Sequence, residues 1–107
     1  MSVGPPSVVF CSLLLVGCAS AIPVPTEQDT EVGLRTYPGL TTEELNHGRK
    51  LYVAKCAGCH TLFLPSDRPA AAWPMLVEQM SERASLTASD RGSIERYLAT
   101  IARRGGR

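Results

Sequence analysis

The chain has 107 residues, 44% of them hydrophobic, and a formal net charge of +1. That length fits one domain, and the near-neutral total gives no indication of nucleic-acid binding. The charge is unevenly placed: nothing before Glu27 is charged, and from Arg35 onward there are eleven basic and seven acidic residues. We therefore expect the charged part of the chain, not its apolar start, to meet partner proteins.

The first residues resemble an export signal. Residues 8–16 are almost entirely apolar, too short to cross a bilayer but typical of the central region of a signal peptide. Leu15-Val16-Gly17-Cys18 resembles a bacterial lipobox, which predicts a signal peptide over 1–17 and a diacylglycerol on Cys18. The small residues Ala19-Ser20-Ala21 also fit an ordinary signal peptidase site. We expect an outer-membrane lipoprotein facing the periplasm, with a soluble periplasmic protein as the alternative.

Residues 18–40 carry three prolines and show no apolar periodicity. A segment of this composition buries too little apolar surface to offset its ordering entropy. We therefore predict a flexible linker from the lipid to a domain over 41–104. Tyr37-Pro38-Gly39 predicts a turn at its end.

A helix is predicted from Thr41, the expected N-cap, to about Lys55, with Glu44 completing a capping box. Its inner face follows helical spacing and consists of Leu45, Gly48, Leu51 and Tyr52. Gly48 costs about 1 kcal/mol relative to Ala in a helix. Close approach of another helix would explain it, although a tolerated glycine in an ordinary amphipathic helix is the alternative.

The sequence Cys56-Ala57-Gly58-Cys59-His60 follows this helix. C-x-x-C-H is the attachment pattern of c-type haem. Two thiols at this spacing can each add to a vinyl group at one porphyrin edge, and the histidine can then ligate the iron. A redox dithiol would follow a strand, and a zinc site needs a second Cys or His pair. Neither context is evident, so we predict covalent haem at Cys56 and Cys59, with His60 as an axial ligand.

Two further helices are predicted. One begins at Trp73-Pro74, with Pro74 at its first position. The indole N–H of Trp73 could donate to a haem propionate, or the ring could simply pack in the core. Arg68 could pair with a propionate or lie in solvent. The last helix begins at Thr87 as N-cap, and its apolar face consists of Ile94, Tyr97, Leu98 and Ile101.

Residues 40–102 resemble a small monohaem cytochrome c. The resemblance lies in the haem motif and in three flanking stretches, 48–52, 73–80 and 94–98. It implies an exported, all-α domain wrapped around one covalently bound haem c. It also implies that the helix of Gly48 crosses the C-terminal helix at Tyr97 and Leu98, and that a carbonyl near Pro65 orients the proximal imidazole.

The candidates for the other axial ligand are Met75, Met80 and His47. Met75 and Met80 are about 140° apart on a helix, so only one is expected to face the iron. Met80 shares a face with Leu76 and Val77, and Val77-Glu78-Gln79-Met80 resembles the Val-x-x-Met run of small cytochromes whose methionine binds iron. We therefore predict Met80.

These expectations together describe an electron-transfer protein without substrate turnover of its own. Its redox partners are expected to be acidic near the docking face, because the domain carries a basic surplus. Two alternatives remain open: a haem-bearing subunit of a larger oxidoreductase complex, and a ligand-binding or sensing module whose sixth iron position is open.

Overall fold

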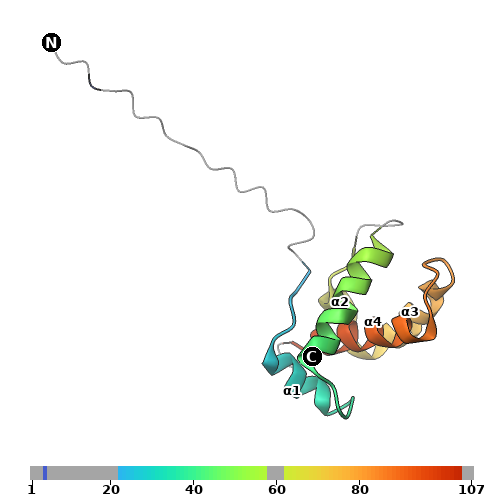
Figure 1. Cartoon of the computed structure of the whole chain (residues 1–107), viewed down its shortest axis with the longest axis horizontal. Helices are drawn as coiled ribbons and strands as arrows, with labels where there is room; N and C mark the ends of the chain where they lie inside the picture. Colours follow the sequence, from blue (N-terminus) through green and yellow to red (C-terminus); the bar gives the residue numbers. More distant parts are fainter. Residues whose placement is uncertain (1–3, 5–21, 58–61, 105–107) are drawn as a thin grey trace.

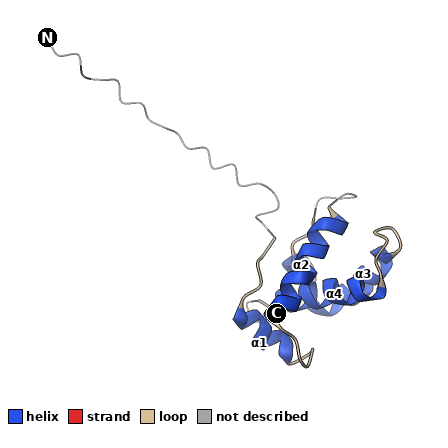
Figure 2. Ribbon diagram, in the orientation of Figure 1, coloured by secondary structure: helices blue, strands red, loops and turns tan. Residues whose placement is uncertain are grey.

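The computed structural model describes residues 4, 22–57 and 62–104, and the helices account for most of these (Figure 1, Figure 2). In chain order they are α1 (Glu27–Leu34), α2 (Thr42–Cys56), the 3₁₀ turns η2 (Pro65–Asp67) and η3 (Ala70–Ala72), α3 (Trp73–Ser81) and α4 (Ala88–Ile101). The described residues contain no strand, so the predicted all-α class is confirmed. None of the helices in these ranges has the length and apolarity needed to traverse a bilayer.

The helix starts lie where the capping residues predict. The Thr41 hydroxyl accepts a hydrogen bond from the Glu44 amide, and the Thr87 hydroxyl accepts one from the Asp90 amide, both at 3.1 Å. Each bond satisfies one of the amides that a helix start leaves without an intrahelical partner. The predicted capping box at Thr41 is only half formed, because the Glu44 carboxylate forms a 2.7 Å ion pair with Arg96 of α4 and so links two helices.

The most extensive helix contact is between α2 and α4, which cross in Figure 1. Gly48 lies at this crossing: a Cβ there would be 2.8 Å from Tyr97 Cβ and closer still to the Ser93 carbonyl oxygen. The expected approach of the C-terminal helix to Gly48 is therefore confirmed. Only a residue without a side chain allows the backbones to come this close.

The core is built around α4. Its predicted apolar face, Ile94, Tyr97, Leu98 and Ile101, is at most 3% exposed. Trp73 and Val77 of α3 pack into the same cluster, as does Tyr52 of α2. The Tyr52 and Tyr97 rings lie 6.3 Å apart with their planes tilted by 43°, within the range of favourable aromatic pairs.

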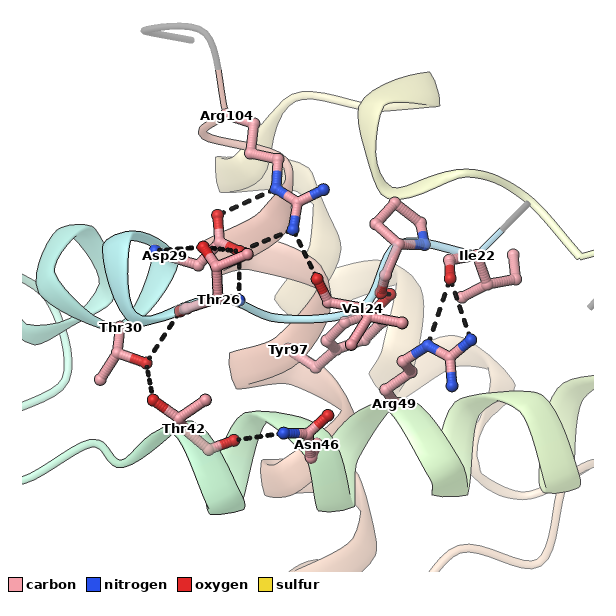
Figure 3. A network of polar contacts seen from close by, with 11 residues as sticks. Ile22, Val24, Thr26, Asp29, Thr30, Thr42, Asn46, Arg49, Tyr97 and Arg104 are labelled. Carbon is pink, nitrogen blue, oxygen red and sulfur yellow. Dashed lines mark hydrogen bonds and ion pairs between the residues drawn. The ribbon is translucent and has the colours of Figure 1, made fainter. Parts of the chain in front are cut away.

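The prediction of a flexible linker over 18–40 is wrong for its described part, residues 22–40. Residues 27–34 form α1, which contacts α4 and α2. Ile22 and Leu40 are buried, and Asp29 forms a 2.6 Å ion pair with Arg104 (Figure 3). The predicted turn is present: Gly39 has φ +82°, and the Leu40 amide donates to the Tyr37 carbonyl. Composition alone missed the helix because its contacts are with residues far along the chain.

Candidate haem site

Cys56 is the last residue of α2, and its half-buried side chain lies at an apolar hollow between α2, α3 and α4. Because α2 is anchored at its crossing with α4, the position of Cys56 is set by the most extensive helix contact of the fold. Cys59 and His60 lie outside the described residues, as does Cys18. Cys56 is therefore the one predicted haem-binding cysteine whose surroundings can be examined.

The hollow is small, and only apolar atoms are exposed on its wall. Its lining residues come from all three helices and the loop before α4: Tyr52, Cys56, Val77, Met80, Leu86, Ile94 and Leu98. Its volume is only about 10 Å³, far below the roughly 300–1,000 Å³ of a typical ligand pocket, so a haem could contact this wall but could not be enclosed by it. An apolar wall that also presents a thiol and a thioether has the chemistry that a covalently attached haem requires.

The three candidates for the second axial ligand lie in different surroundings. Met80 lines the hollow together with Cys56. The side chain of Met75 is 65% exposed on the outer side of α3, and His47 is exposed on α2. Of the three, Met80 alone lies at the same hollow as the attachment cysteine.

Two buried aromatic side chains hold the segment that follows the haem motif. The Tyr52 hydroxyl donates to the Phe63 carbonyl at 2.6 Å, and the Trp73 indole N–H donates to the Pro65 carbonyl at 2.9 Å. Trp73 is 1% exposed and its N–H already donates to the Pro65 carbonyl, which favours the packing alternative over a propionate bond. Arg68 lies 5.1 Å from the centroid of the Phe63 ring, an ordinary cation–π distance.

Burial is the main reason that the pKa of Tyr52 rises to about 12, and the nearby Cys56 contributes in the same direction. A tyrosine is already neutral near pH 7, so burial only extends the neutral range to higher pH. Tyr52 therefore lines the hollow and donates a hydrogen bond throughout this range.

Leu86 is the lining residue that the sequence analysis did not place in the core. It directly precedes the Thr87 N-cap of α4. A hydrophobic residue at this position often packs against the fourth residue of the helix, but that residue is Arg91 here, so the local pattern gave no signal for Leu86.

The profile of a family described as dihaem cytochrome c matches residues 52–107, which is about half of the chain. The matched region begins at Tyr52 and includes the haem motif, α3 and α4. It supports a c-type cytochrome with covalently bound haem, whereas its description names two haems. No curated protein and no solved structure matches the chain significantly.

Proposed function

Because the chain belongs to the dihaem cytochrome c family, we propose that it is a one-electron carrier with a single haem c, ligated by His60 and Met80. A single haem is supported by the sequence, which contains one C-x-x-C-H motif. The other two cysteines, Cys11 and Cys18, precede the haem domain. The haem iron, when bound, would supply the chemistry of accepting and releasing one electron.

Each residue at the site has a distinct task in this proposal. Cys56 and Cys59 would hold the porphyrin covalently, and His60 would supply an imidazole to the iron. Met80 supplies a thioether, which raises the potential relative to a second imidazole. The apolar side chains around Cys56 would contact one side of the porphyrin and shield that side from water.

The observation that carries the proposal is that Cys56 and Met80 line one apolar hollow, while Met75 is 65% exposed. With both axial positions filled, the protein would have no site for an exogenous ligand, so it would exchange electrons without substrate turnover. An open sixth position would instead favour the alternative of a ligand-binding or sensing module.

Met80→Ala is the test, with Met75→Ala as the matched control. We expect Met80→Ala to lower the potential, to remove the weak sulfur-to-iron band at the near-infrared edge of the ferric spectrum, and to admit carbon monoxide in the ferrous protein. Met75→Ala should leave all three unchanged. If Met80→Ala stays low-spin and the three changes appear in Met75→Ala instead, Met75 and not Met80 is the iron ligand. Carbon monoxide binding by the unmutated protein would favour the sensing module.

We further propose that the protein works in the bacterial cell envelope, exported by residues 1–17 and anchored through Cys18. The lipobox-like sequence before Cys18 supports this anchor. The basic surplus beyond Arg35 supports acidic redox partners. Partner reduction rates that do not change between low and high ionic strength would argue against electrostatic steering.

The family description favours one second candidate, a haem-bearing subunit that works beside another haem in a larger redox assembly. The mass of the matured chain distinguishes the possibilities, because one covalent haem per polypeptide is expected here and two would contradict the single-haem proposal. Light scattering of the protein isolated from its native membrane would reveal a stable partner.

A further inference from the structure

Three consecutive carbonyls near the start of the described chain are each held by a side chain from the haem domain (Figure 3). The Ile22 carbonyl accepts from Arg49 of α2, through Nε at 3.2 Å and Nη2 at 3.0 Å. The Pro23 carbonyl accepts from the Tyr97 hydroxyl of α4 at 2.6 Å, and the Val24 carbonyl accepts from Arg104 Nη2 at 2.7 Å. We call residues 22–24 the docked segment.

The docked segment continues into α1, which is fixed in turn. Arg104 donates to both carboxylate oxygens of Asp29, at 2.9 and 2.6 Å. Asp29 also accepts from the Thr26 amide in a capping box at the start of α1. Ile22 is 2% exposed and Asp29 is 5% exposed. The chain from Ile22 onward is thus a part of the haem domain and adds no length to a tether.

From this geometry we infer that the protein lies directly on the lipid surface, with the docked segment next to the membrane. The inference depends on the lipid anchor proposed above. Four peptide units join Cys18 to Ile22, and even fully extended they reach only about 14 Å. A flexible linker over the whole of 18–40 would instead allow a root-mean-square reach of about 26 Å and free rotation.

The haem attachment site is also brought near the membrane. Arg49, which holds Ile22, and Cys56 belong to the same helix and are separated by seven residues, or about 10 Å along the helix axis. A domain held this closely cannot reach across the periplasm. Its electron donor or acceptor would therefore be a protein embedded in, or bound to, the same membrane.

The test measures the distance from haem to lipid in the matured full-length protein, reconstituted in vesicles that carry a fluorescent headgroup label. Haem absorbs visible light and quenches the label by energy transfer. One variant has twenty Gly-Ser residues inserted between Ala21 and Ile22, which lengthens the tether without touching a described contact. The matched control carries the same twenty residues after Arg107.

We expect strong and equal quenching by the unmodified protein and the control, and at least a two-fold weaker quenching by the insertion variant. Equal quenching by all three would overturn the inference and leave the electron-transfer proposal intact. Vesicle flotation and the N-terminal residue of the mature protein test the anchor separately. If the mature protein begins at Ile22 and does not float with the vesicles, it lacks the anchor, and this also overturns the inference. The Met80→Ala spectra do not depend on either result.

Discussion

Replacing Gly48 with Ala has two opposite effects on stability at the crossing of α2 and α4, and the unfavourable one is the larger. Alanine favours the helical state over glycine by about 1 kcal/mol. Against this, the new Cβ would lie 2.8 Å from Tyr97 Cβ and 2.9 Å from the Ser93 carbonyl carbon. The Ser93 carbonyl belongs to the backbone and Tyr97 Cβ is bonded directly to it, so neither atom can move away unless the two helices separate.

Overpacking of this kind costs about 1–3 kcal/mol, and contact with backbone places Gly48→Ala at the upper end. After the helix-propensity gain, we expect a net loss of about 2 kcal/mol in the free energy of unfolding. For a domain of this size, that corresponds to a fall of about 10 °C in the melting temperature.

Gly92→Ala in α4 is the matched control. The nearest atoms to its added Cβ belong to the flexible Arg96 side chain, at 3.6 Å or more, so the propensity gain is unopposed. This variant should be stabilised by up to about 1 kcal/mol. The assay is thermal unfolding of the haem-loaded proteins, followed at 222 nm and in the Soret band. The steric argument fails if Gly48→Ala melts at or above the temperature of the unmutated protein.

Two further predictions concern the docking of residues 22–34. Burial alone would raise the pKa of Asp29, but hydrogen bonds, chiefly from Arg104, outweigh it and hold this pKa below its usual value. Asp29→Asn should therefore cost about 2 kcal/mol at pH 7. The stability difference between the two proteins should shrink as the pH falls below about 4, because Asp29 becomes protonated in the folded protein and the stabilisation by its carboxylate is lost. Urea titrations at pH 7 and pH 3 measure this difference. Tyr97→Phe should cost about 1–2 kcal/mol in the same assay, because the Pro23 carbonyl loses its donor. Tyr37→Phe is its control, since the Tyr37 hydroxyl has no hydrogen bond among the described residues; equal costs would mean that the bond to Pro23 contributes nothing.

The local features of the chain were predictable from short stretches of sequence. Thr41 and Thr87 cap their helices, and Tyr37-Pro38-Gly39 forms a turn with a positive φ at the glycine. These features depend on residues within four positions of one another, so a short window of sequence contains all the atoms involved. The same holds for the haem motif, whose five residues carry its chemistry by their spacing alone.

The candidate site was predictable only in part. Periodicity placed Met80 on the face of Val77, and the structure puts both at the hollow with Cys56. Periodicity could not decide what the Trp73 indole would bind, because the Pro65 carbonyl competes with any propionate and its position depends on how the intervening loop folds. Burial of a polar group selects whichever partner the packing brings within reach.

Only the tertiary structure decided that residues 22–40 belong to the domain. The stretch has the composition of a linker. Leu40 packs against Gly33 of α1, but most of the contacts of α1 are with α4 and α2, outside the stretch. Asp29 is fixed by Arg104, which lies 75 residues further along the chain, and the Pro23 carbonyl is fixed by Tyr97, 74 residues away. From the local sequence, only the conformational entropy lost on ordering such a segment can be judged. The compensating bonds exist only once α2 and α4 have crossed and brought their arginine and tyrosine side chains to one face.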